Sequence, residues 1–181
     1  MYIRTFVKLC EKAWTLTALA LIGRGTPIRV AVLATAAGTT RSSMRPSIQH
    51  LFELGLLVHN PGHGHPLRPE AKLTSEGEYW AEFALKLEET MRSDDERRLI
   101  RLNWTLPTLR VAETPVRFTV LRNTLAPVRD SALSMALRRL ESSGWLERQV
   151  DSELRPPQVA YLTINRGREI ADLLRDTVTL N

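Results

Sequence analysis

The sequence predicts a mainly α-helical chain with small β-hairpins, built as two copies of one unit. Two observations lead to this prediction. A series of motifs returns at an offset of 88 to 90 residues, and the same order of helical and strand patterns follows in each copy. The length of 181 residues allows one large domain or two small ones, and the returning motifs favour two.

The repeat is visible as matched motifs in matched order. Trp14 opens a Trp-Thr-Leu motif that returns at Trp104, and Thr26 opens a Thr-Pro-x-Arg motif that returns at Thr114. Further pairs follow, in chain order: the Leu-x3-Gly-x-Leu motifs at Leu51 and Leu140, Pro66 and Pro156, and Gly77 and Gly167. The period is too long for a solenoid repeat and predicts a duplicated domain, with boundaries at residues 1–92 and 93–181.

The first elements of each copy are helices. In the first copy, apolar residues recur at helical spacing over residues 6–17. In the second copy, the capping box at residues 93–96 predicts a helix that starts near Asp94. Asn103 then interrupts the helical pattern, and Pro107 fits the first turn of the next helix. A further short helix follows each Thr-Pro pair.

A third helix in each copy ends at a glycine, Gly55 or Gly144. We expect a hairpin next, with strands at 56–58 and 71–74 in the first copy and at 145–150 and 158–164 in the second. Closing helices follow at 75–91 and 165–177. Three helices and a two-stranded hairpin describe a winged helix-turn-helix, so the predicted fold is a tandem of two such units joined through residues 75–102.

Motifs of the second copy carry a family resemblance. They are Trp104, the pair Arg117 and Phe118, the Leu-x3-Leu-x2-Leu-Glu-x2-Gly pattern of residues 133–144, and the Pro-Pro-x-Val-x-Tyr wing of residues 156–161. In these motifs the copy resembles the HxlR-type, broadly MarR-like, winged-helix transcriptional regulators. The resemblance implies double-stranded DNA as the partner and transcriptional regulation, by repression, as the function.

The sequence also departs from the family pattern. In the first copy, Val30, Phe52 and Ala71 replace the residues that the family pattern has there. The N-terminal cysteine of the family has no counterpart, because Cys10 lies too close to Trp14. The redox sensing that the family cysteine implies is therefore not carried over to this chain.

Composition supports a nucleic-acid partner. The formal net charge is +5, and four lysines stand against 21 arginines, the residue that suits bidentate contact with phosphate. A single cysteine excludes a disulfide framework and any cysteine-based zinc finger. The longest apolar stretch, residues 13–22, is too short to span a bilayer, and no signal-peptide layout is present. We therefore expect a cytoplasmic, nucleoid-associated protein that contacts no membrane.

The second helix of a helix-turn-helix motif lies in the major groove of DNA. In the second copy this helix falls near residues 129–142, where leucines form the core face. The predicted DNA contacts of this copy are Arg129, Ser131, Ser134, Met135, Arg138 and Arg139 on the helix, Arg148 and Arg155 on the wing, and Arg117. An ordinary solvated helix face is the alternative interpretation.

The matching helix of the first copy has different chemistry. Its outward face is predicted to carry Ser42, Pro46, Gln49 and His50, and the proline predicts a shorter, less basic helix. This copy either binds DNA weakly, or through its wing, or holds the second copy as a scaffold, and the scaffold is favoured. The secondary DNA contacts are Arg41, Ser42, Gln49, His50 and Arg68.

Other functions receive less support. His59, His63 and His65 could suggest a metal site, but an exposed wing tip is favoured, and we expect neither metal nor cofactor. No nucleophile elbow, P-loop or His-Glu-x-x-His motif is present, so no enzyme is expected. The alternatives are a tandem winged-helix scaffold subunit of the chromosome-condensing type, which binds protein partners, and a plasmid or phage replication initiator.

The apolar stripe of residues 80–87 is expected to pack the two copies together. Such packing would give a monomeric pseudo-dimer. A homodimer formed through the first and last helices is the alternative.

Overall fold

The structure, a computed structural model, describes residues 2–60, 70–152 and 157–180. The chain folds into two compact units. The N-terminal unit is Glu11–Arg97, and the C-terminal unit combines Arg98–Asn181 with Met1–Cys10. This division differs from the predicted boundary after residue 92, since the first ten residues group with the second half of the chain.

The cause of this difference is a short helix at the start of the chain. Helix α1 (Ile3–Leu9) buries Ile3, Phe6 and Leu9 and packs against α7 (Thr105–Val111). The Ile3 N–H donates to the Thr179 carbonyl at 2.9 Å, beside a parallel bridge from Tyr2 to Thr179. The start and the end of the chain therefore belong to one core.

The helical pattern of residues 6–17 is divided between two helices. Helix α1 ends at Leu9, and α2 (Thr15–Gly23) begins six residues later. Between them, the Trp14 N–H donates to the hydroxyl of Ser47 at 3.2 Å. This tertiary hydrogen bond replaces the intrahelical bond that a continuous helix would have at Trp14.

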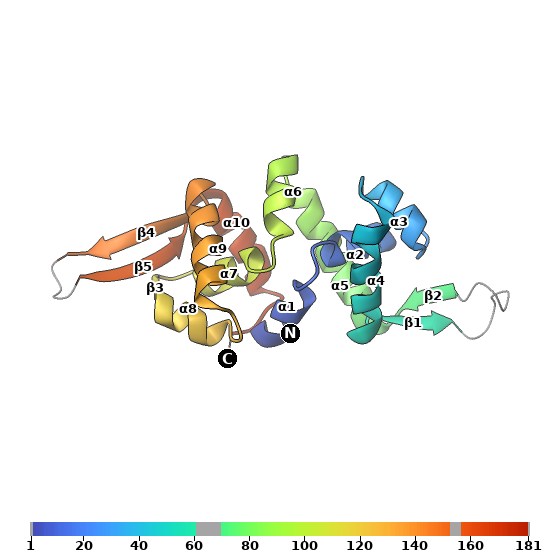
Figure 1. Cartoon of the computed structure of the whole chain (residues 1–181), viewed down its shortest axis with the longest axis horizontal. Helices are drawn as coiled ribbons and strands as arrows, with labels where there is room; N and C mark the ends of the chain where they lie inside the picture. The colour runs from blue at the N-terminus through green and yellow to red at the C-terminus, as the bar shows by residue number, and fades with distance from the viewer. Residues whose placement is uncertain (1, 61–69, 153–156, 181) are drawn as a thin grey trace. The chain divides into compact units, whose positions relative to one another are not determined.

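The remaining elements of the N-terminal unit appear in the predicted order. They are α3 (Val30–Ala36), α4 (Arg41–Glu53), β1 (Leu57–Asn60), β2 (Glu70–Leu73) and α5 (Ser75–Thr90) (Figure 1). Strands β1 and β2 pair antiparallel from Leu57↔Leu73 to Asn60↔Glu70. The apolar stripe of α5, with Trp80 and Leu87, packs against α2 of the same unit.

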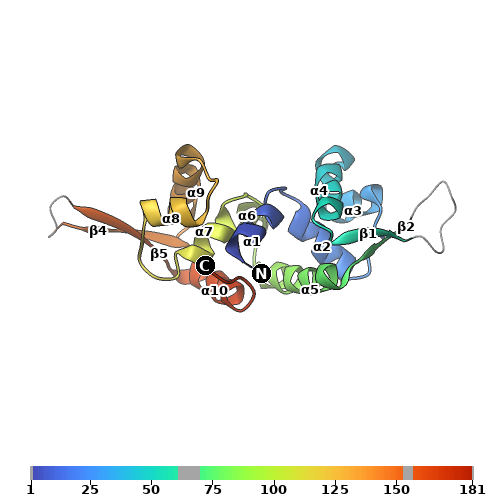
Figure 2. The same ribbon diagram turned by 90° about the horizontal axis from the view of Figure 1, so that it is seen from below.

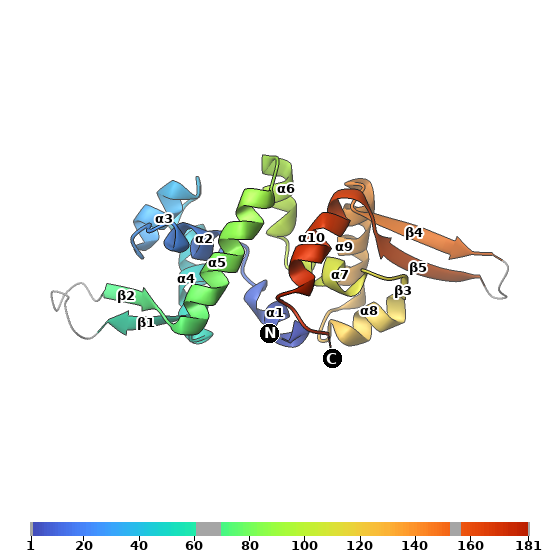
Figure 3. The same cartoon turned by 180° about the vertical axis from the view of Figure 1, so that it is seen from behind.

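The C-terminal unit contains the same series and one more strand. Helix α6 (Asp94–Ile100) leads into it, and α7, β3 (Val116–Arg117), α8 (Phe118–Thr124), α9 (Asp130–Ser142), β4 (Leu146–Asp151), β5 (Gln158–Thr163) and α10 (Asn165–Arg175) follow. The sheet has the order β3-β5-β4, with Val116 opposite Tyr161. Figure 3 shows α10 beside α7, on which it packs.

Both units have the winged helix-turn-helix architecture that the sequence predicts. Within each unit, two helices lie on one side of the hairpin and the closing helix lies on the other (Figure 2). These are α3 and α4 against α5, and α8 and α9 against α10. The helix preceding each hairpin ends as predicted, with positive φ at Gly55 (+70°) and Gly144 (+69°).

Candidate nucleic-acid interface

Helix α9 is amphipathic, and its two faces are as the sequence predicts. Its core face buries Leu133, Ala136, Leu137 and Leu140. The opposite face exposes Ser131, Met135, Arg138 and Arg139, and Ser134 is half-buried at its edge. Met135 is 50% exposed, which leaves its side chain available for contact with a partner.

The N-terminus of α9 adds charges of both signs. Arg129 is the N-cap residue, with an extended backbone and an exposed side chain. Asp130 follows, and its carboxylate lies 3.7 Å from Arg122 of α8. Sequence reasoning missed Arg122. A helical wheel anchored on the buried Leu121 and Leu125 would have placed it on the exposed face.

The wing and the strand β3 carry the other predicted arginines of this unit. Arg148 is exposed on β4, opposite Tyr161 of β5, and Arg117 is exposed where β3 passes into α8. Arg155 lies outside the described residues. The unit therefore presents cations on the recognition helix, on the helix before it and on the wing, which are the elements that contact DNA in this architecture (Figure 1).

Ion pairing separates two groups of arginines. In residues 98–152 and 157–180, Arg110, Arg166 and Arg175 are paired with carboxylates of their own unit. The five predicted contacts that are described have no ion pair within the described residues: Arg117, Arg129, Arg138, Arg139 and Arg148. Unpaired exposed guanidinium groups can bind phosphate without first losing a protein partner.

The matching helix of the N-terminal unit corrects two predictions. Helix α4 has 13 residues with Pro46 inside, and α9 also has 13, so α4 is not shorter. Pro46 has no N–H to donate to the carbonyl of Ser42, four residues before it. Both residues are exposed, so water can hydrogen-bond to that carbonyl instead. Nor is α4 less basic. It carries two arginines, Arg41 and Arg45, and one carboxylate, Glu53, whereas α9 carries two arginines and two carboxylates.

The position of His50 is a further correction. His50 was predicted on the outward face, but it is 6% exposed, with Nδ1 at 3.5 Å from Glu53. The reason is its place on the wheel: His50 lies beside the buried Ser47, at the edge of a core face that is wider than the apolar spacing indicates. The exposed face carries Arg45 instead, which sequence reasoning did not select.

The other secondary DNA contacts predicted for the N-terminal unit differ in their exposure and hydrogen bonding. Arg41 and Ser42 are exposed at the start of α4, and the hydroxyls of Ser42 and Thr40 share a hydrogen bond of 2.9 Å. Gln49 is exposed and its amide donates to Glu53 at 3.0 Å. Arg68 lies outside the described residues.

Comparison with known protein families matches residues 99–180 to the HxlR-like helix-turn-helix family. This segment is an HxlR-like helix-turn-helix domain. It holds α7 to α10 and every described arginine of the unpaired group. Proteins of this family are DNA-binding regulators of transcription, and the match of residues 99–180 supports a DNA-binding, transcription-regulating role for the chain. Among curated proteins and solved structures, no match to the chain is found.

The predicted histidine cluster lies only partly within the described residues. Two of the three clustered histidines, His63 and His65, lie outside them, and the ring of His59 stacks on Phe52 with centroids 4.6 Å apart. The described residues hold no group of three potential metal ligands. None of the described helices has the length and apolar character needed to cross a membrane.

Proposed function

We propose that the chain is a sequence-specific repressor of transcription that reads double-stranded DNA through α9 of the HxlR-like domain. The observation that carries the proposal is the group of exposed arginines without ion pairs on α9, β3 and β4. A DNA-binding surface keeps such charges available for phosphate, and their neutralisation there releases counterions.

Each exposed residue of α9 has a chemical role in this proposal. Arg138 and Arg139 bind guanine edges or phosphates, because the guanidinium fork fits both. Ser131 donates to a base or a phosphate, and Met135 packs against the methyl group of thymine. Arg117, Arg129 and Arg148 neutralise phosphates and hold the register of the domain on the duplex.

The N-terminal unit has an auxiliary role in the proposal. It positions the HxlR-like domain as a scaffold, and Arg41 and Arg45 add weak phosphate contacts. Two features support the weaker role: the family match does not include α4, and Gln49 is held by Glu53 on its own helix.

The decisive experiment is selection of bound fragments from a random DNA library by the full chain at fixed salt. We expect enrichment of one sequence motif, and we expect the double variant R138A/R139A to lose that enrichment. A reporter with the selected motif across its promoter should then fall in activity when the chain is expressed. Absence of enrichment, with only weak salt-sensitive binding, would exclude sequence-specific reading and favour a protein-binding scaffold.

A further inference from the structure

The first residue of α9 places a negative charge on a helix face that is otherwise cationic. Asp130 begins the helix, and its side chain is 63% exposed. Its neighbours in the sequence are Arg129 and Ser131, two residues that the proposed function places on DNA. A carboxylate repels the phosphates that these residues approach, so its exposure at this position needs a physical reason.

The fold makes little use of this carboxylate. No side-chain hydrogen bond caps the start of α9. Among the described residues, the polar partner of Asp130 is the guanidinium of Arg122 on α8, at 3.7 Å. This distance is longer than a hydrogen bond, and the Arg122 side chain is 44% exposed, so the pair is loose and is screened by water. The carboxylate oxygens therefore remain able to accept hydrogen bonds from another molecule.

The N-terminal unit has the opposite charge at the matching position. Arg41 is the first residue of α4, and the Leu-x3-Gly-x-Leu motifs of the two copies align it with Asp130. Residues 12–52, which include nearly all of α2 to α4, contain no carboxylate. A negative charge at the start of the second helix of the motif therefore belongs to the HxlR-like domain and not to the repeated unit as such.

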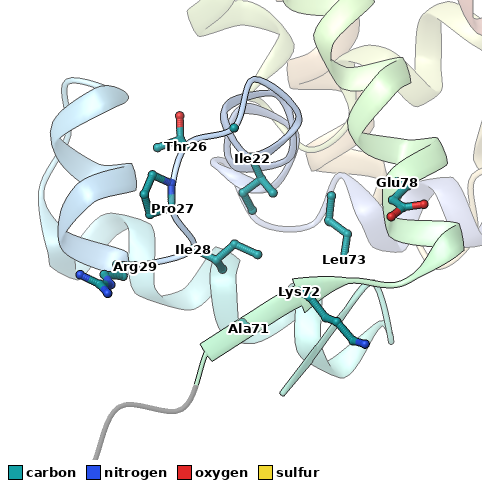
Figure 4. A pocket seen from close by; sticks show the side chains of 10 residues that line it. Ile22, Thr26, Pro27, Ile28, Arg29, Ala71, Lys72, Leu73 and Glu78 are labelled. Atoms are coloured by element: carbon teal, nitrogen blue, oxygen red, sulfur yellow. The ribbon is translucent and has the colours of Figure 1, made fainter. Parts of the chain in front are cut away.

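The hairpin side of the N-terminal unit keeps the same separation of charge. Figure 4 shows Arg29 and Lys72 pointing away from a pocket beside β2, on opposite sides of it. The acidic residue of the pocket lining, Glu78, belongs to the closing helix α5, which is not one of the elements that contact DNA in this architecture. This contrast makes Asp130 the exception that needs an explanation.

The position of Asp130 selects the group that it can meet on DNA. In a helix-turn-helix, the N-terminal residues of the second helix contact base edges in the major groove. The groove offers a carboxylate two amino donors, N4 of cytosine and N6 of adenine. Adenine also presents the acceptor N7 beside its amino group, and this acceptor repels a carboxylate, whereas cytosine presents only a donor. Cytosine is therefore the base that fits an aspartate.

We propose that Asp130 determines specificity by accepting a hydrogen bond from the N4 amino group of one cytosine in the bound sequence. Arg122 lies on the helix that crosses the DNA backbone, where its guanidinium binds a phosphate and reduces the repulsion between Asp130 and DNA. The inference rests on the proposed function of α9. It adds a base preference that the exposed arginines do not supply, because arginine selects guanine.

The test repeats the selection from a random DNA library with the full chain and the variants D130A, D130N and E141A. Wild type should fix a C·G pair that D130A no longer fixes, while the other positions of the motif stay the same. D130N should prefer adenine at that position, because an amide bonds both N6 and N7. The control E141A removes a carboxylate from the other end of the same helix and should select the wild-type motif.

Titration of labelled duplexes at one salt concentration measures the size of the effect. Replacing the fixed C·G pair by T·A should weaken wild type at least about fivefold and D130A less than about twofold. The variant R122A should weaken both duplexes by the same factor, because a phosphate contact carries no base preference. If D130A also weakens both duplexes equally, Asp130 only holds Arg122 or stabilises the start of the helix, and the inference is overturned.

The outcomes separate this inference from the function on which it rests. A wild-type motif in which D130A retains every fixed C·G pair overturns the role of Asp130 and leaves the proposed function standing. The same holds for a wild-type motif without such a pair. The absence of any wild-type motif overturns both.

Discussion

Two glycines occupy places where a β-carbon has no room. A Cβ on Gly77, in the first turn of α5, would overlap the carbonyl oxygen of Leu56, and a Cβ on Gly167, in α10, would overlap that of Trp145. In both units the closing helix therefore starts in contact with the backbone that enters the hairpin. This contact gives a physical reason for the glycines that recur in the sequence at matched positions.

We predict that G77A destabilises the N-terminal unit by about 1–3 kcal/mol, the usual cost of overpacking. The matched control is G23A in the same unit, where a Cβ would lie 3.3 Å from the Ala81 oxygen and needs only a small shift. Urea denaturation followed by circular dichroism measures both variants. Equal stability of G77A and G23A would show that the start of α5 adjusts without cost.

A buried arginine joins the end of the chain to α7. Arg110 is 8% exposed, its Nε donates to the Val178 carbonyl at 2.6 Å, and a second nitrogen lies 3.0 Å from Glu113. Glu113 also accepts from Arg175 at 2.8 Å, and this hydrogen bond raises the pKa of Arg175. The Arg110 hydrogen bonds thus hold the tail against which α1 lies.

We predict that R110M lowers the free energy of unfolding of the C-terminal unit by about 2–3 kcal/mol, because a charge-assisted hydrogen bond is lost and the Val178 carbonyl loses its donor. The exposed arginine variant R168M is the control, since its guanidinium makes only a 3.3 Å contact with the Glu113 carbonyl. Chemical denaturation compares the two. A cost for R110M no larger than that for R168M would contradict a structural role of the buried charge.

At the scale of elements, helices α9 and α4 offer a matched test of DNA reading. We predict that R138A/R139A weakens binding to the selected motif at least tenfold, about 1.4 kcal/mol, and that R41A/R45A weakens it less than threefold. Both variants remove two exposed arginines from a helix of 13 residues, so the loss of charge is the same. Titration of labelled DNA at one salt concentration measures both.

The outcome of this comparison assigns the reading helix. A larger loss from R41A/R45A would move sequence reading to α4, where both arginines lie in the N-terminal half of the helix. His50 is left out of the comparison because its burial makes H50A a change to the core. Thermal melting of each variant separates a loss of contacts from a loss of folding.

Sequence patterns predicted most elements because their signals are local. The glycines that end α4 and α9, the capping serine of α6 and the first-turn Pro107 of α7 each act within a few residues. Strand β3 was not predicted, because two residues carry no alternation and their pairing partner lies on β5. After the break that follows α1, the Trp14 N–H donates to the distant hydroxyl of Ser47, a contact that no local pattern reveals.

The candidate site was predicted only in part, because some of its residues are placed by tertiary packing and not by local signals. Leucine spacing located the exposed face of α9, since three leucines define its core side. On α4 the core side includes Ser47 and His50, polar residues that a hydrophobic pattern counts as exposed. Burial of these residues is a property of tertiary packing, so His50 was included and Arg45 was omitted.

At the scale of the whole molecule, two winged-helix units in one chain can stand in for the pair of units that a dimer provides, with α9 as the reading helix and the N-terminal unit as its scaffold. We therefore predict that the chain is a monomer, with a mass of 20.5 kDa by light scattering at micromolar concentration. The same measurement on the chain bound to its selected motif should show one chain per site. Twice the chain mass in free solution would support a homodimer instead.

The origin of the first ten residues of the C-terminal unit leads to the last prediction. The repeated motifs assign residues 1–10 to the first copy, because a repeat compares residues in chain order. Such a comparison does not tell which hydrophobic core a helix at the end of the chain joins. Three apolar side chains of α1 are buried: Ile3, Phe6 and Leu9 are 2%, 0% and 0% exposed. Burying each stabilises the unit by about 1.5–3 kcal/mol before the cost of ordering the helix.

The last prediction compares two fragments. One is residues 93–181 alone, and the other carries residues 1–10 at its C-terminal end, joined through a linker of about eight glycine and serine residues. We predict that the first fragment has a free energy of unfolding lower by at least about 2 kcal/mol. Such a connection is feasible because Ile3 is hydrogen-bonded to Thr179 at 2.9 Å, which places the two ends together. The control carries serine at Ile3, Phe6 and Leu9 and should lose the gain. Urea midpoints compare the three proteins. If all three unfold at the same midpoint, α1 contributes nothing to this core, and the boundary after residue 92 is the correct one.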